Sequence, residues 1–108
     1  MSDPLGQERA AALAQIEALT REFDEVVAAS RSSNADDEHD PEGATIAFER
    51  QQVAALLEQA RRRLADVEAA VRAVESGTYG RCEACGRPIT AERLAARPTA
   101  RTCIDCAR

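Results

Sequence analysis

The apolar residues between positions 5 and 30 recur in steps of three and four. This series comprises Ala12, Ile16, Leu19, Phe23 and Val26. Such spacing places apolar side chains on one face of a helix. Because Gly6 weakens the first turn, we expect the first helix to span about residues 7–30.

A second and longer apolar series keeps a heptad spacing over about four repeats. Its members are Ile46, Val53, Leu57, Ala60, Leu64, Val67, Val71 and Val74. Thr45 can cap the start of this helix, and Ser76 with Gly77 can end it, because glycine tolerates the left-handed conformation common just after a helix. The second helix is therefore expected over about residues 45–75.

The two apolar series are joined by residues 31–44, which are rich in turn-forming side chains. A turn near Asp37 lets the two helices pair within one chain as an antiparallel coiled-coil hairpin. By this count the facing pairs are Phe23 with Val53, Leu19 with Leu57, and Ile16 with Ala60. The hairpin predicts a monomer, whereas pairing of both series with other chains in a parallel dimer or bundle is the alternative.

Four cysteines occur in two Cys-x-x-Cys pairs, Cys82 with Cys85 and Cys103 with Cys106, and seventeen residues separate the pairs. Each pair lets two thiolates approach one side of an ion, and two pairs together supply the four ligands of tetrahedral Zn²⁺. With four sulfur ligands no position stays open for substrate, so we predict one structural zinc. The alternative is two disulfides or four unrelated thiols.

The residues around the cysteines suggest how the zinc module folds. Gly80 and Gly86 allow sharp bends beside the first pair, so that backbone amides can point at the sulfurs. Thr90 can cap a short helix over Ala91–Ala96, and Pro98 prevents its simple extension. The apolar side chains available to cover the site are Tyr79, Ile89, Leu94 and Ile104. We expect an all-α protein with a helical hairpin over 1–76 and a four-cysteine zinc finger over 77–108.

Charge is distributed unevenly along the chain, whose formal net charge is −5. Between Asn34 and Gly43 the connection carries five acidic residues and neither Lys nor Arg: Asp36, Asp37, Glu38, Asp40 and Glu42. The zinc segment is nearly neutral once the thiolates and the metal are counted, and aromatic residues make up only 3% of the chain, which disfavours direct DNA or RNA binding. The sequence shows no membrane span and no signal peptide, so we expect a cytoplasmic protein.

The segment from Gly77 to Cys106 resembles the DksA/TraR C4 zinc-finger family. The matching residues are Gly77-x-Tyr79-Gly80-x-Cys82-x-x-Cys85-Gly86-x-x-Ile89 and Arg93-Leu94-x-Ala96-Arg97-Pro98-x-Ala100-x-x-Cys103-x-x-Cys106. The hairpin with its acidic connection fits the same family. The resemblance implies a transcription regulator that binds RNA polymerase, inserts its hairpin into the secondary channel and does not bind DNA.

The resemblance also implies that the hairpin tip acts on the polymerase. The family's tip pattern is Asp-x-x-Asp-x-Ala, and the ungapped count from Cys82 places His39, Glu42 and Ala44 on it. A shifted register uses Asp37 and Asp40 instead. The candidate effector residues are Asp37, Asp40, Glu42 and Ala44. For the alarmone guanosine tetraphosphate, which some members bind, Asp66 and Ala107 replace two family lysines, so no alarmone response is expected.

Other functions are less compatible with the residues. His39 lies among carboxylates with no buried base or nucleophile beside it, so we predict no enzymatic activity. A coiled-coil zinc-binding adaptor without polymerase activity is the main alternative. A redox sensor that releases zinc when its thiols are oxidised is a further one.

Overall fold

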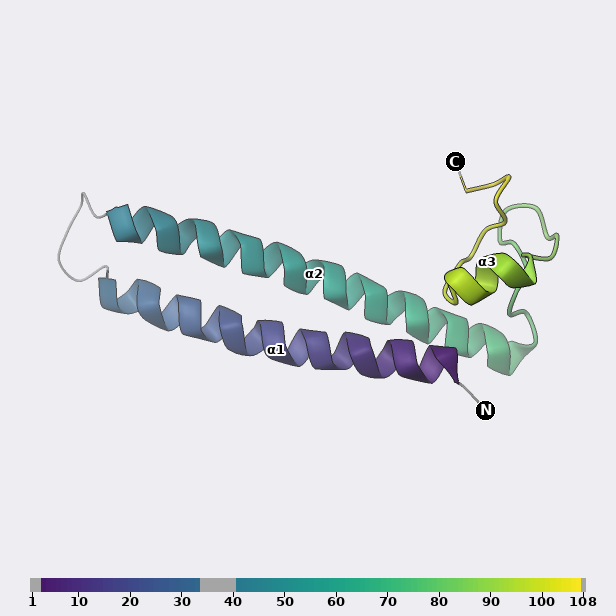
Figure 1. The fold of residues 1–108 in the computed structure, drawn as a ribbon, viewed down its shortest axis with the longest axis horizontal. Helices are drawn as coiled ribbons and strands as arrows, with labels where there is room; N and C mark the ends of the chain where they lie inside the picture. The colour runs from purple at the N-terminus through teal and green to yellow at the C-terminus, as the bar shows by residue number, and fades with distance from the viewer. Residues whose placement is uncertain (1–2, 34–40, 108) are drawn as a thin grey trace. The chain divides into compact units, whose positions relative to one another are not determined.

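A computed structural model describes residues 3–33 and 41–107, and these residues form three helices (Figure 1). Helix α1 spans Pro4–Ser33, α2 spans Pro41–Ser76 and α3 spans Ala91–Ala96. Within the described residues there is no strand, and the only bridge of the β type joins Arg81 to Pro88. The predicted all-α class, with a two-helix hairpin and a C-terminal cysteine module, is confirmed.

Helix α1 begins three residues earlier than the expected position near Gln7 because Asp3 caps it. The Asp3 side chain accepts a hydrogen bond from the Gly6 amide at 3.1 Å, and its carbonyl accepts one from the Gln7 amide at 3.0 Å. Pro4 occupies the first turn, where the missing N–H of proline costs nothing. The cap therefore offsets the weakening effect of Gly6.

Helix α2 begins at Pro41, so Thr45 lies inside the helix and its predicted role as the cap is wrong. Proline is favoured at a first helical position because its backbone angle is already helical. The other end is as predicted. Gly77 follows Ser76 with a positive φ of 78°, and the amides of Gly77 and Thr78 donate to carbonyls of the last turns, Val74 at 3.2 Å and Ala73 at 2.8 Å.

The described chain folds as two compact units. One unit comprises Ala11–Arg62, and the other comprises Met1–Ala10 together with Arg63–Arg108. The two helices contribute to both units, whereas the cysteine module belongs to the second alone. The predicted division into a hairpin over 1–76 and a finger over 77–108 stays a prediction.

The core of the Ala11–Arg62 unit lies where the apolar series of α1 packs against that of α2, as predicted. Leu19 of α1 forms a buried cluster with Val53, Leu57 and Ala60 of α2. Ile16 and Phe23 pack against this cluster and stay partly exposed. These six side chains are the ones that the antiparallel register paired, so the intrachain hairpin is confirmed over this segment.

In the second unit the start of α1 meets α2 through an ion pair. Arg63 donates through both Nε and Nη2 to Oε2 of Glu8, at 3.2 and 3.0 Å. Both side chains are only partly exposed, 41% for Arg63 and 35% for Glu8. Val67, one turn further along α2, is fully buried. In the part of the chain that the structure describes, no helix combines the length and apolarity that crossing a membrane requires.

Candidate metal centre

The first cysteine pair lies in a tight loop between Gly80 and Ile89. The Ile89 amide donates to the Gly80 carbonyl at 2.7 Å, and the Cys82 amide donates to the Arg87 carbonyl at 2.8 Å. Gly80 and Gly86 adopt positive φ angles of 82° and 77°, a conformation that side chains disfavour. The two glycines therefore make the bends that the sequence assigned to them.

The second cysteine pair is brought beside the first by backbone hydrogen bonds. The Cys106 amide donates to the Cys103 carbonyl at 3.1 Å and closes the second turn, while the Glu83 amide donates to the Arg101 carbonyl at 2.8 Å. Helix α3 lies between the pairs in sequence, and the Thr90 side chain caps it by accepting from the Arg93 amide at 3.2 Å. The predicted cap and helix bounds are confirmed.

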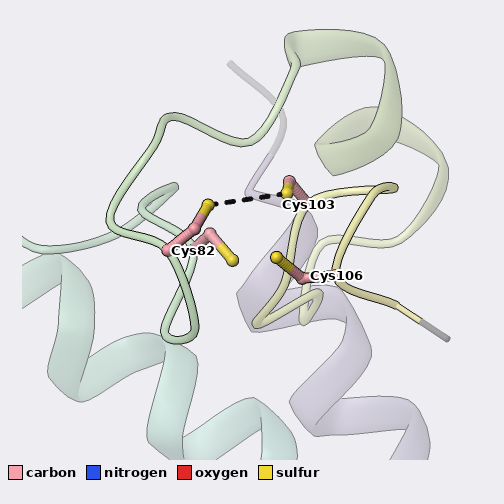
Figure 2. Close-up of side chains that lie close together, drawn as sticks. Cys82, Cys103 and Cys106 are labelled. Atoms are coloured by element: carbon pink, nitrogen blue, oxygen red, sulfur yellow. Dashed lines mark hydrogen bonds between the residues drawn. The ribbon is translucent and has the colours of Figure 1, made fainter.

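The four sulfur atoms converge on one point. They lie within 4.8 Å of one another, and the Sγ atoms of Cys85 and Cys103 are 3.8 Å apart. Figure 2 shows the sulfurs of Cys82, Cys103 and Cys106 directed toward the same space. Tetrahedral Zn²⁺ with Zn–S bonds of about 2.3 Å holds its sulfurs about 3.8 Å apart, so the donor set and its spacing fit this ion.

The thiols differ in how readily they lose a proton. A backbone N–H of Cys103, with further amides of Cys85 and Ala84, lowers the pKa of Cys82 to about 6. Hydrogen bonds from Cys106 to the thiols of Cys103, Cys82 and Cys85 raise the pKa of Cys106 to about 12. Cys82 is thus available as a thiolate at neutral pH, and a cation must displace the proton of Cys106.

The apolar cover of the site is smaller than the sequence indicated. Ile89 is buried and Leu94 is half-buried, as expected of covering residues. Ile104, however, is 70% exposed, and the prediction that it covers the site is wrong. Tyr79 is 36% exposed and its hydroxyl donates to the Pro98 carbonyl at 2.8 Å. With so little buried apolar surface, we expect the module to depend on metal for much of its stability.

The sequence did not predict two contacts that arginine side chains make in the module. Arg93 donates through Nε to the Thr102 carbonyl at 2.9 Å. Arg101 donates through Nη2 to Oδ1 of Asp66 on α2 at 3.0 Å. No motif predicts either contact, because the partners are a backbone carbonyl and a helix residue 35 positions away.

The structure leaves the predicted tip largely outside its described residues. Asp37 and Asp40 fall in the segment 34–40, which lies outside the described residues. Glu42 is in the first turn of α2, and Ala44 is two residues further along and exposed. The effector role of all four residues stays a prediction.

A helical hairpin whose end carries four converging cysteines defines a zinc-finger protein of the four-cysteine type. Residues 77–108 match the family model described as the prokaryotic dksA/traR C4-type zinc finger. The chain belongs to the DksA/TraR family, and with its four cysteines this assigns it one structural zinc ion.

Relatives of known name support the same assignment. The chain is 45% identical over 72 residues to the uncharacterized protein YteA of Bacillus subtilis, an alignment that covers 67% of this chain and 30% of the relative. It is 46% identical over 46 residues to the RNA polymerase-binding transcription factor DksA of Escherichia coli, which covers 43% of this chain and 30% of that protein. The chain thus spans about a third of the length of these curated relatives.

A solved structure extends the likeness beyond the cysteine module. The structure of transcription factor DksA2 from Pseudomonas aeruginosa matches with a TM-score of 0.57 and 28% identity. The match covers 94% of this chain and 78% of the DksA2 chain. The helices are therefore part of the resemblance as well as the zinc finger.

Proposed function

We propose that the protein regulates transcription by binding RNA polymerase through its secondary channel, with the hairpin entering the channel and the zinc module at its base. The observation that carries this proposal is the likeness to transcription factor DksA2, because it extends over nearly the whole chain, helices included. The name of the Escherichia coli relative, an RNA polymerase-binding transcription factor, supplies the partner. In this function the protein is not an enzyme and acts as a cytoplasmic monomer.

The direct test is whether purified bacterial RNA polymerase retains the protein. The full chain should bind core polymerase and change the yield of transcripts in an in vitro transcription assay. A competitor that occupies the secondary channel should displace it. If polymerase neither binds the chain nor changes its output, the coiled-coil adaptor function replaces this proposal.

Within this function, Cys82, Cys85, Cys103 and Cys106 are the ligands of the zinc ion. The 3.8 Å separation of the Cys85 and Cys103 sulfurs supports this, because it matches the distance between two sulfur ligands of a tetrahedral zinc ion. Native mass spectrometry of freshly reduced protein should give one zinc per chain. Replacing Cys103 with serine should abolish that stoichiometry, and full retention of zinc by this variant would remove Cys103 from the ligand set.

The same function should proceed without guanosine tetraphosphate. Asp66 stands where the resemblance places a lysine, and it already pairs with Arg101 at 3.0 Å. A carboxylate at this position repels a polyphosphate. Its ion pair with Arg101 also makes that guanidinium less available to bind phosphate groups. Addition of the alarmone to the transcription assay should leave the effect of the protein unchanged.

A further inference from the structure

The segment Ala100–Thr102, which leads into the second cysteine pair, joins two other parts of the module through its backbone. The Arg101 carbonyl accepts from the Glu83 amide, between the cysteines of the first pair, at 2.8 Å. The next carbonyl, of Thr102, accepts from Arg93 Nε on α3 at 2.9 Å. The position of Arg101 is therefore set by the parts of the chain that surround the metal.

The side chain of Arg101 leaves the module and reaches α2. Its Nη2 atom lies 3.0 Å from Oδ1 of Asp66. The two side chains are 45% and 52% exposed, so the pair is open to solvent and sensitive to salt. The Arg101 side chain thus connects the module to α2. Its backbone carbonyl connects the segment before the second cysteine pair to the first cysteine pair.

Next to this ion pair, the boundary between α2 and the module is not completely filled by side chains. A hollow of about 190 Å³ lies there. Its helix wall consists of Ala69, Ala70 and Ala73, and the opposite wall comes from residues 78–83 and 99–101. Alanine side chains are too short to interdigitate with the module. Dispersion contacts therefore constrain the orientation of the module relative to α2 only weakly. The connection also contains two glycines with positive φ, Gly77 and Gly80.

From these contacts we infer that Asp66 and Arg101 are positioning residues that clasp the metal-bound module to α2 and set its orientation. The clasp depends on metal, because the backbone that places Arg101 is ordered by the two cysteine pairs. It affects orientation and leaves zinc affinity unchanged, because neither side chain touches a sulfur. An ion pair of this exposure shifts the ratio of clasped to unclasped module by up to about fivefold.

Residual dipolar couplings measured by NMR on the full, zinc-loaded chain test the clasp. In the wild type, backbone amides of residues 63–76 and of the module should fit one alignment tensor. Asp66→Asn should reduce the module couplings relative to those of α2 while one zinc per chain remains bound. The exchanged pair Asp66→Arg with Arg101→Asp should restore them. Glu58→Gln is the control, because it removes a more exposed ion pair on the same helix, with Arg62 at 3.5 Å, that does not involve the module.

Four outcomes would contradict the inference. Unchanged couplings in Asp66→Asn would show that the pair does not set the orientation. Failure of the exchanged pair to restore the couplings would show that the charges do not act on each other. Loss of zinc from Asp66→Asn would assign the pair to metal binding. In chelated protein, Asp66→Asn should have no further effect, and a further effect would disprove the dependence on metal.

Discussion

At the scale of single residues, the spread in thiol pKa values makes zinc binding depend on pH. Protons compete with Zn²⁺ for each thiolate, so apparent affinity should rise with pH. Backbone amides, chiefly that of Cys103, lower the pKa of Cys82 to about 6, and this thiolate is lost as the pH falls through that value. Cys106, whose pKa is raised to about 12 by hydrogen bonds to the neighbouring thiols, loses its proton only to the metal.

We therefore expect apparent zinc affinity to fall steeply between pH 7 and about pH 5. Competition with a chelator of known proton affinity, repeated across this range, measures the effect. Replacing the buried, amide-bonded Cys82 with serine should remove the part of the profile near pH 6. A constant affinity from pH 5 to 8 would contradict the assignment of thiolate ligands.

Residue chemistry also shows which details could be predicted from sequence. The convergence of the four cysteines was predictable because two short cysteine spacings have few uses other than holding a metal. The Asp66–Arg101 contact was not, since it depends on how the module lies against α2, which no periodicity encodes. The exposure of Ile104 was missed for a similar reason: its apolar character predicts burial, while the turn that holds the second cysteine pair leaves it 70% exposed.

At the scale of the elements, the hairpin is held together by a narrow seam of apolar side chains between α1 and α2. Two neighbouring leucines of α2 show how narrow this seam is, because one lies in it and the other on the surface. Leu57 is 8% exposed within the core cluster, whereas Leu56 is 45% exposed. Leu57→Asp should lower the free energy of unfolding by about 3–5 kcal/mol, because it leaves a charge unpaired in the seam. Thermal unfolding followed by circular dichroism measures this loss.

Leu56→Asp is the matched control and should cost about 1 kcal/mol or less. Equal destabilisation by the two variants would mean that Leu56 is buried in solution, as in the alternative in which both helices pair with other chains. Sedimentation of the wild type at low concentration separates these cases, because the hairpin predicts the mass of one chain.

The existence and pairing of the two long helices followed from the spacing of their apolar residues, whereas the positions at which they begin did not. Side-chain periodicity identifies the face that packs, whereas a helix begins where local groups satisfy its first amides. Asp3 supplies such a group for α1, and Pro41 needs none at the first position of α2. Both starts were therefore decided by single residues outside the apolar series.

At the scale of the whole molecule, the proposed regulation depends on the charge of the tip. In the double variant Asp40→Asn with Glu42→Gln, polymerase binding should change little, since most of the contact would come from the helices and the module. The effect on transcription should be lost, because a carboxylate that meets cations or Mg²⁺ in the channel contributes about 1–3 kcal/mol. In vitro transcription at saturating protein measures this.

The control for the tip is Glu17→Gln, which removes an exposed pair with Arg21 in the middle of α1. Such a change on a solvated surface is worth about 0.5 kcal/mol or less, so this variant should regulate like the wild type. If the double tip variant also regulates normally, the acidic connection is not the effector, although polymerase binding by the rest of the chain would stand.

The ion pair between Glu8 and Arg63 also bears on the time course of folding. It joins residues 55 positions apart, and closing a longer loop costs more entropy, so pairing should start nearer the connection and reach Glu8 late. A contact formed after the main barrier changes the unfolding rate alone. Glu8→Gln should then speed unfolding by up to about fivefold and leave refolding unchanged in stopped-flow experiments. Slower refolding would instead place the start of α1 in the folding nucleus.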